Sequence, residues 1–208
     1  MTGMPDLPSR YDSCPEVCGR LEHPGLATDM PIWIDHTREE TTVDQARIEG
    51  ALEGMDIEDR HVLHVGVGNS RFAQRFAGRV RLVDGLTVSP REKELADSLR
   101  IANYTVHLLS KYGREFLRMI ENRYDFIVDN NLASFACCKY HFFRMLDNYL
   151  WCLRPRGLIL TDQRGMDWTV DDDPRWKLTF EDLVALERRF PVAVAKVTDT
   201  VYEIGGLP

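Results

Sequence analysis

The sequence lacks the features that would point to a membrane or to nucleic acid. None of its apolar runs approaches the ~18 residues that would span a bilayer. Its first residues have neither the basic start nor the apolar segment of a secretion signal. Basic residues are in the minority, with 26 Lys and Arg against 33 Asp and Glu, which gives a net charge of −7. Because an acidic chain without a basic cluster binds nucleic acids and anionic membranes poorly, we expect a cytoplasmic protein with neither partner.

Cysteine is also scarce, and we predict no metal site. The five cysteines are an odd number in a chain without an export signal, which indicates reduced thiols. Cys14, Cys18 and His23 are spaced in a way that invites a zinc interpretation, but a closed tetrahedral site needs more ligands than these. Cys137 and Cys138 are adjacent, so they would point in different directions on a helix.

What is present suffices for one globular domain. The chain has 208 residues, of which 44% are hydrophobic, and this is typical of a single domain. Five of the ten prolines lie in the first 31 residues, and proline fixes φ and removes a hydrogen-bond donor. We therefore expect residues 1–40 to form an irregular proline-rich arm or lid and residues 41–208 to form one domain. The sequence is compatible with a homodimer and leaves the oligomeric state open.

From residue 41 onward, helix and strand signals alternate. Capping residues or helical periodicity predict helices that begin after Thr41, Ser70, Ser89 and Thr179, and further helices over residues 114–122 and 142–153. Short apolar runs predict strands at residues 61–65, 80–83, 104–109, 124–129, 157–161, 192–197 and 200–204. Strands separated by helices form a parallel sheet that is covered on both faces. The last two strands are joined by only two residues, so they must be antiparallel.

Ligands of such sheets bind beyond the carboxyl ends of the strands, which directs attention to the loops there. The loop after the first strand, residues 65–70, contains Gly66 and Gly68. Glycines let the backbone approach a ligand closely, and the following helix N-terminus offers unpaired N–H groups to an anion. A nicotinamide-dinucleotide motif would have a third glycine at position 71, where Arg71 stands. The same loop is also compatible with a tight strand–helix turn that binds nothing.

Taken in order, the motifs resemble those of the class I S-adenosylmethionine-dependent methyltransferases. Residues 62–70 resemble the glycine-rich first motif of that family, and residues 124–131 resemble its fourth-strand motif. Residues 85–90 stand where the family has a strand-end acid followed by Ser-Pro, and residues 153–160 look like its proline–glycine turn into the fifth strand. The resemblance implies an α/β, Rossmann-like methyltransferase fold, with a mostly parallel seven-stranded sheet, an antiparallel C-terminal strand pair and helices on both faces. It also implies S-adenosylmethionine as the cofactor and S-adenosylhomocysteine as the product.

The resemblance assigns the cofactor site to the ends of the first four strands. By this assignment the cofactor-binding residues are His64, Gly66, Gly68, Asn69, Ser70, Asp84, Thr87, Ser110, Asp129 and Asn130. The chain departs from the family at several positions. His64 replaces the acid before the glycines, Ser70 replaces the third glycine, and the usual acid is missing where Ser110 and Lys111 end the third strand. These departures leave open that the chain binds the cofactor weakly or binds something else.

Two residues compete for the ribose of the cofactor, which the family holds with an acid that ends the second strand. Alignment on Ser89 and Pro90 names Thr87, whereas Asp84 is the nearest carboxylate. Both lie roughly 20 residues beyond Gly66, the distance typical of a ribose-binding acid. We favour Thr87, because the helix start that Ser89 fixes lies two residues beyond it.

Methyl transfer asks the protein mainly to orient the reactants, since the sulfonium of the cofactor is already an activated electrophile. A base is needed only where the acceptor must lose a proton, and histidine is best matched to neutral pH. His36, before the first helix, and His141, after the fourth strand, are the candidate catalytic residues, and each is also compatible with an exposed polar position. Arg164 and Trp168, after the fifth strand, are candidates for an acceptor pocket, with an ordinary loop as the alternative.

The function expected from the sequence is S-adenosylmethionine-dependent methyl transfer to a small-molecule acceptor, such as a natural-product intermediate. We expect O-methylation ahead of N-methylation. Two alternatives stay open. The chain would either transfer another group, such as aminocarboxypropyl, from the sulfur of the same cofactor, or be a non-catalytic methyltransferase-like protein that binds a ligand or a partner.

Overall fold

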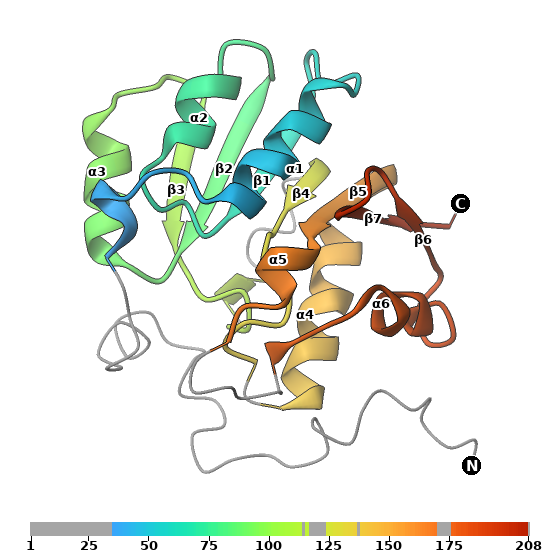
Figure 1. The fold of residues 1–208 in the computed structure, drawn as a ribbon. Coiled ribbons are helices and arrows are strands. Elements are labelled where there is room, and N and C mark those ends of the chain that lie inside the picture. Colours follow the sequence, from blue (N-terminus) through green and yellow to red (C-terminus); the bar gives the residue numbers. More distant parts are fainter. Residues whose placement is uncertain (1–34, 114, 117–123, 137, 170–175, 208) are drawn as a thin grey trace.

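A seven-stranded sheet forms the centre of the molecule (Figure 1). The computed structural model describes residues 35–113, 115–116, 124–136, 138–169 and 176–207. Across the sheet the strands are β3 (Tyr104–Leu108), β2 (Leu82–Thr87), β1 (His61–Val65), β4 (Tyr124–Val128), β5 (Leu153–Asp162), β7 (Val201–Gly206) and β6 (Val192–Lys196). Neighbouring strands are parallel, except that β7 is antiparallel to both β5 and β6. The predicted sheet with its antiparallel C-terminal pair is therefore confirmed.

The order of the strands reverses between β1 and β4. From β1 the chain moves outward through β2 and β3, then returns to the other side of β1 and continues through β4 and β5. Because β1 is parallel to both β2 and β4, the carboxyl ends of all three meet at the same edge. The crevice at such a reversal is where open α/β sheets bind their ligands.

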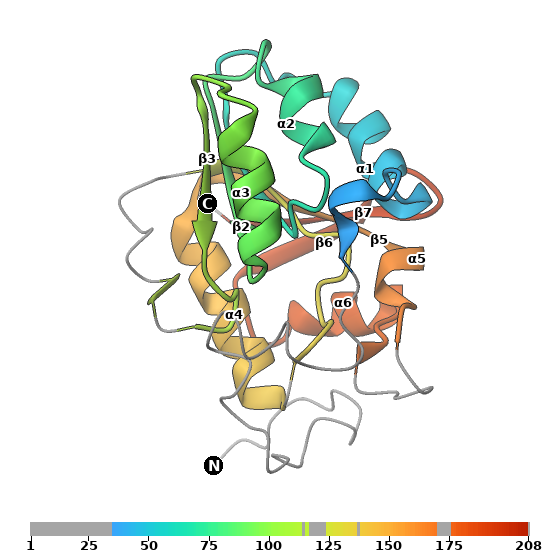
Figure 2. The ribbon, with the colours of Figure 1, turned by 90° about the vertical axis from the view of Figure 1, so that its left-hand side faces the viewer.

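Helices cover both faces of the sheet. Their bounds are η3 (a 3₁₀ helix, His36–Arg38), α1 (Val43–Glu53), α2 (Arg71–Phe76), α3 (Pro90–Ser98), α4 (Lys139–Cys152), α5 (Gln163–Met166) and α6 (Phe180–Leu186). On one face, Ile48 of α1 and Phe72 of α2 share a core cluster with Val62 of β1. On the other face, Phe142 of α4 and Leu183 of α6 share a larger cluster with the sheet. Figure 2 shows α1, α2 and α3 gathered on one side of the sheet, away from α4.

Capping signals predicted two helix starts correctly. Ser89 accepts a hydrogen bond from the backbone N of Glu92 (3.4 Å) and starts α3, with Pro90 in the first turn. Thr179 and Asp182 form the predicted capping box of α6. These caps depend on residues within one turn, so the sequence alone can specify them.

Two other predicted capping bonds do not form, because tertiary contacts engage the side chains elsewhere, although α2 does begin directly after Ser70 as predicted. The helix expected after Thr41 begins at Val43 without a side-chain cap, and Asp44 instead accepts a hydrogen bond from Asn130. Ser70 adopts the left-handed backbone region (φ 57°) and makes no cap bond to α2. Its hydroxyl lies 3.1 Å from the Tyr104 hydroxyl, in the strand at the edge of the sheet.

The remaining differences concern boundaries. The strand predicted at 80–83 begins at Leu82 and runs to Thr87, and the strand predicted at 157–161 begins at Leu153. The helix predicted over 142–153 begins one turn earlier, at Lys139. The helix predicted over 114–122 and residues 1–34 of the predicted arm lie outside the described residues, as do Cys14, Cys18 and His23.

Candidate functional site

A cavity of about 400 Å³ lies at the carboxyl edge of the sheet, and its size falls in the range of small-molecule sites. Segments that follow β1, β2, β3, β4 and β5 contribute to its wall, together with η3 and α1. The predicted site residues that line it are His36, His64, Gly66, Gly68, Asn69, Thr87, Ser110, Asp129, Asn130, Arg164 and Trp168. Three predicted residues, Ser70, Asp84 and His141, are not part of the lining. The topology therefore brings most of the predicted site together at one place.

The glycine loop forms the centre of the cavity wall. Gly66 (φ 79°) and Gly68 (φ 49°) both have left-handed backbone angles, which residues other than glycine rarely adopt. The backbone N of Gly66 is bonded to the Leu86 carbonyl (2.8 Å), so the loop is fixed against β2. A Cβ atom at Gly66 would meet no atom within 4 Å. Glycine is needed here for the backbone conformation, and the open space beside it lets a ligand approach the backbone.

Residues 35–39 cover this loop. Asn69 donates from Nδ2 to the Glu39 carbonyl (2.7 Å), and Asp35 pairs with Arg91 at 3.1 Å. His36 lines the cavity, and its Cβ lies 3.5 Å from where a Cβ on Gly68 would be. The segment before α1 is thus attached to both the glycine loop and α3, and it places His36 at the cavity.

A buried carboxylate that the sequence analysis did not assign to the site, Glu92, lies beside the end of β2. Its Oε2 accepts hydrogen bonds from the Thr87 hydroxyl (2.5 Å) and from the backbone N of Gly68 (3.3 Å). Burial raises the pKa of Glu92, and the hydrogen bond from Thr87 opposes this shift. The spacing Ser89–Pro90–Glu92 was visible in the sequence, but a glutamate in that place of a helix start ordinarily bonds back to the cap. Here the Ser89 N–H is taken by the Thr87 hydroxyl (3.0 Å), so Glu92 is available to the cavity.

Asp84, the alternative candidate for the ribose, is buried and does not line the cavity. Its Oδ2 accepts a hydrogen bond from the Tyr124 hydroxyl (2.7 Å), and its Oδ1 lies 3.4 Å from His107 Nε2. The side chain is buried within β2, well before the strand ends at Thr87. Of the two candidates it is therefore Thr87, with Glu92 behind it, that reaches the cavity wall.

His64 has a buried imidazole ring that stacks on Phe72, with ring centroids 4.4 Å apart. Within the described part of the chain, neither of its ring nitrogens has a hydrogen-bond partner. Burial lowers the pKa of His64 to about 3, so the ring is neutral at physiological pH. A side chain with a donor and an acceptor, both unsatisfied at a cavity wall, is suited to contact a bound ligand.

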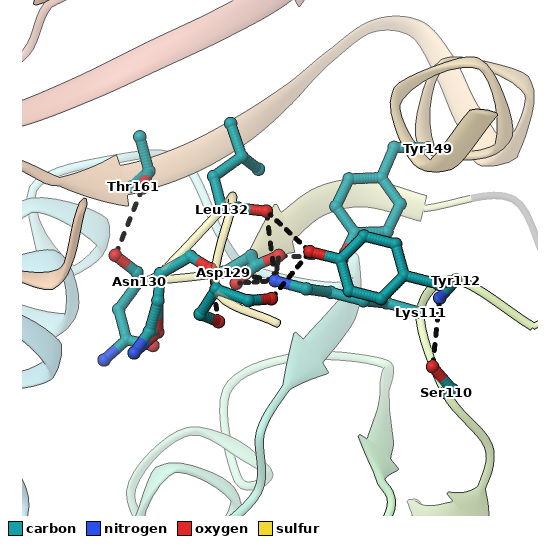
Figure 3. A network of polar contacts seen from close by, with 10 residues as sticks. Ser110, Lys111, Tyr112, Asp129, Asn130, Leu132, Tyr149 and Thr161 are labelled. Carbon is teal, nitrogen blue, oxygen red and sulfur yellow. Dashed lines mark hydrogen bonds and ion pairs between the residues drawn. The ribbon is translucent and has the colours of Figure 1, made fainter. Parts of the chain in front are cut away.

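Lys111 and Asp129 both line the cavity and form an ion pair that is almost fully removed from solvent (Figure 3). Lys111 Nζ donates to both carboxylate oxygens of Asp129 (2.9 and 3.2 Å) and to the carbonyls of Asn131 (2.9 Å) and Leu132 (3.1 Å). The Tyr149 hydroxyl also donates to Asp129, at 2.8 Å. Burial lowers the pKa of Lys111, and the Asp129 charge opposes this shift. The Asp129 carboxylate therefore accepts hydrogen bonds from both Lys111 and Tyr149. No local sequence pattern reveals these contacts.

Asn130 joins the cavity wall to α1 and α5. Its Nδ2 donates to Asp44 Oδ2 (2.5 Å), and its carbonyl accepts from the Thr161 hydroxyl (3.3 Å). A Cβ atom on Gly165 would lie 2.1 Å from the Asn130 carbonyl oxygen, closer than any real contact. Only glycine fits at position 165, and this close approach fixes the segment after β5 against the segment after β4.

His141, predicted as a catalytic candidate with an exposed helical position as the alternative, does not line the cavity and is not exposed. Its side chain is buried in α4, and Nδ1 lies 3.1 Å from the Cys138 sulfur. The helix begins earlier than predicted, which places His141 in its first turn.

Among the described residues, no helix has both the length and the apolar character needed to cross a membrane. The same residues contain no group of three or more His, Cys, Asp or Glu side chains placed to hold a metal ion.

The fold was compared with known proteins. No protein-family model and no curated protein matches the chain. Among solved structures, the N-methyltransferase NodS from Bradyrhizobium japonicum in complex with S-adenosylhomocysteine matches with a TM-score of 0.60 and 12% identity, over 82% of this chain and 90% of NodS. A protein from Staphylococcus aureus assigned as a caffeoyl-CoA O-methyltransferase matches with a TM-score of 0.59 and 14% identity, over 81% of this chain and 87% of that one. An rRNA methylase from Streptococcus thermophilus matches with a TM-score of 0.56 and 12% identity, over 81% of this chain and 99% of the methylase.

These likenesses establish the fold. The chain has the Rossmann-like fold of class I methyltransferases, with the mostly parallel seven-stranded sheet and the antiparallel C-terminal pair that the sequence predicted. Its cavity lies at the switch point of this fold, and the glycine loop and Glu92 meet there.

Proposed function

We propose that this chain, built on the class I methyltransferase fold, binds S-adenosylmethionine and transfers its methyl group to a small-molecule acceptor, with oxygen favoured over nitrogen as the acceptor atom. The observation that carries the proposal is the meeting of a glycine loop and a buried carboxylate, Glu92, in one cavity at the switch point. Structural neighbours crystallised with S-adenosylhomocysteine support the choice of cofactor.

The residues present fit this cofactor. Gly66 and Gly68 would let the methionine part approach the backbone, and Glu92, positioned by the Thr87 hydroxyl, would accept hydrogen bonds from the ribose. His64 would form a hydrogen bond to the cofactor through one of its own ring nitrogens. Ser110 lines the cavity and would contact the adenine. When bound, the cofactor supplies a methyl group activated by its positive sulfur. Of the acidic side chains of the lining, Asp129 pairs with Lys111 and Glu49 with Arg75. Glu40, Asp44 and Glu92 make no ion pair with the described residues and suit a ligand that carries this positive charge.

A small acceptor fits the charge of the molecule better than nucleic acid does. One structural neighbour is an rRNA methylase, so the fold allows that substrate class. A net charge of −7 disfavours binding to a phosphate backbone, which depends on clustered Lys and Arg. The cavity is of small-molecule size, and this favours a metabolite as the acceptor.

His36 is the proposed general base for acceptors that must lose a proton. Of the described histidines, His36 and His64 line the cavity, and His64 is fully buried and neutral. We expect His36→Ala to lower turnover by about 10²- to 10⁴-fold and to leave the affinity for S-adenosylhomocysteine nearly unchanged. Turnover equal to that of the wild type would exclude His36 as the base. Steady-state kinetics measures the turnover, and calorimetry on the same preparations measures the affinity for S-adenosylhomocysteine.

The cofactor assignment is tested by titrating S-adenosylhomocysteine into the wild type, Glu92→Gln and Glu94→Gln. A hydrogen bond to an ionised group contributes about 1.5–3 kcal/mol, so Glu92→Gln should weaken binding by about tenfold or more. Glu94 is exposed on the same helix and does not line the cavity, so Glu94→Gln is the matched control and should bind as the wild type does.

Two outcomes would contradict the assignment, and they are distinguishable. If neither S-adenosylmethionine nor S-adenosylhomocysteine binds the wild type at millimolar concentration, the cofactor is wrong. If both bind but Glu92→Gln and Glu94→Gln behave alike, the cofactor is right and its ribose is held elsewhere. Circular dichroism of each variant shows whether it is folded.

A further inference from the structure

The cavity wall formed after β4 and β5 carries a cluster of large aromatic rings. Phe135 and Trp168 line the cavity there, with ring centroids 5.6 Å apart. Trp176 lies behind both rings, 5.0 Å from Phe135 and 5.8 Å from Trp168, and is parallel to Trp168 within 3°. Flat, rigid aromatic surfaces of this kind favour planar ligands, because stacked rings gain more than the buried area alone provides.

The local backbone holds these rings in place. Phe135 adopts a φ of 61°, a left-handed conformation that is strained for a bulky residue and that persists only where the surroundings impose it. The Trp176 indole donates to the Ala136 carbonyl (3.1 Å), next to Phe135 in the chain. The backbone N of Trp168 is bonded to the carbonyl of Gly165, the residue that packs against Asn130. The aromatic wall is thus preorganised from two segments that are themselves in contact.

A positive charge without a partner lies at the same wall. Arg164, one turn before Trp168, is exposed and lines the cavity, and its guanidinium makes no ion pair or hydrogen bond with the described residues. Lys111 also lines the cavity, but Asp129 neutralises it. The carboxylate of Asp44, on the facing helix, accepts a hydrogen bond from Asn130. Arg164 is therefore the group on this side that offers charge to a ligand.

We infer that the acceptor half of the cavity takes a planar aromatic molecule that carries a carboxylate, with its ring against Phe135 and Trp168 and its anion on Arg164. This inference rests on the proposed function, because it assumes that the cofactor occupies the wall at the glycine loop. Guanidinium binds carboxylates in a planar, bidentate geometry, which suits an anion in the plane of a stacked ring. The inference narrows the acceptor from any small molecule to aromatic acids.

The test uses three probes that share a ring system and differ in charge: 2-naphthoate, 2-naphthamide and 2-naphthylmethylamine. Each is titrated by calorimetry into protein that has first been shown to bind S-adenosylhomocysteine and is saturated with it. We expect 2-naphthoate to bind most tightly and Arg164→Gln to weaken it by about tenfold, while the amide is unchanged. Arg188→Gln is the matched control. Arg188 is exposed, follows the end of α6 and does not line the cavity, so this variant should bind all three probes as the wild type does.

A second variant tests the aromatic wall. Trp168→Leu should weaken 2-naphthoate and 2-naphthamide alike by about three- to tenfold, because stacking does not depend on the charge of the probe. Tighter binding of the amine than of 2-naphthoate would overturn the inference in favour of a cationic acceptor held by the rings. Equal affinities in Arg164→Gln and the wild type would also overturn it. Failure to bind S-adenosylhomocysteine in the first step would instead count against the proposed function.

Discussion

At the scale of single residues, the most unusual group in the cavity is the imidazole of His64. It is buried against Phe72, and neither ring nitrogen finds a partner in the described chain. Proteins seldom leave a buried donor and acceptor unsatisfied, because each costs about 1–3 kcal/mol. Under the proposed function, the bound cofactor would supply a partner for one of these nitrogens.

The same residue should make the protein sensitive to mild acid. The pKa of His64 falls from 6.5 in the unfolded chain to about 3 in the folded one, because burial disfavours the charged ring. Below pH 6.5 the unfolded state therefore binds a proton that the folded state does not, and stability falls by about 1.4 kcal/mol per pH unit. Between pH 7.5 and 5.5 the wild type should lose about 1.4 kcal/mol more than His64→Leu. Urea unfolding of both proteins at the two pH values measures this, and parallel losses would show that His64 does not carry the effect.

Single residues also show where sequence reasoning about the site stops. Thr87 was favoured over Asp84 because a local cap, Ser89, fixes the register of the strand end, and that register holds. Asp84 was a fair alternative by spacing alone, but Tyr124, 40 positions away, engages its carboxylate. Glu92 was visible as part of a helix start, whereas its turn toward the cavity depends on Thr87 taking the Ser89 N–H. Contacts of this range are set by packing, which the sequence pattern does not contain.

At the scale of elements, α3 is the helix that carries the site carboxylate. Its first turn holds Glu92, and Ser89 and Pro90 determine where that turn begins. Strand and helix types followed from apolar patterns and caps, so most elements were predictable. Capping bonds failed where a side chain bonds far away in the sequence, as Asp44 does to Asn130 and Ser70 does to Tyr104, although α2 still begins directly after Ser70.

A pair of cap substitutions should separate the role of α3 in the site from ordinary helix stability. Ser89→Ala and Thr179→Ala each remove one N-cap, and each should lower the free energy of unfolding by about 1 kcal/mol. Ser89→Ala should also weaken S-adenosylhomocysteine by about two- to fivefold, because it loosens the turn that holds Glu92. Thr179→Ala should leave that affinity unchanged. Urea denaturation and calorimetry on both variants give the comparison, and equal affinities would mean that the α3 cap does not position the ligand.

At the scale of the whole molecule, the Lys111–Asp129 pair joins segments that follow two strands which are not neighbours in the sheet. Lys111 follows β3 and Asp129 follows β4, and β2 and β1 lie between those strands in the sheet. The pair thus ties together segments from the two halves of the sheet, on either side of β1. Buried ion pairs contribute little net stability, but removal of one partner leaves a charge without compensation.

The pair should therefore behave as a unit. Lys111→Met should lower the free energy of unfolding by about 3–5 kcal/mol, because it leaves the Asp129 carboxylate buried with only neutral donors. The double variant Lys111→Met, Asp129→Asn should recover a large part of that loss, since the charge is then absent. Chemical denaturation of the wild type, both single variants and the double variant completes the cycle. Losses that simply add would show that the two residues act independently.

Residues 35–39 are attached to one half of the cavity and, among the described residues, not to the other. Their anchors, Arg91 and Asn69, belong to α3 and to the glycine loop, which form the half of the cavity assigned to the cofactor. The aromatic half is closed by a different set of contacts, those of Phe135, Trp168 and Trp176. The two halves are thus held by separate contacts, so a substitution that frees residues 35–39 from Arg91 or Asn69 leaves the contacts of the aromatic wall intact.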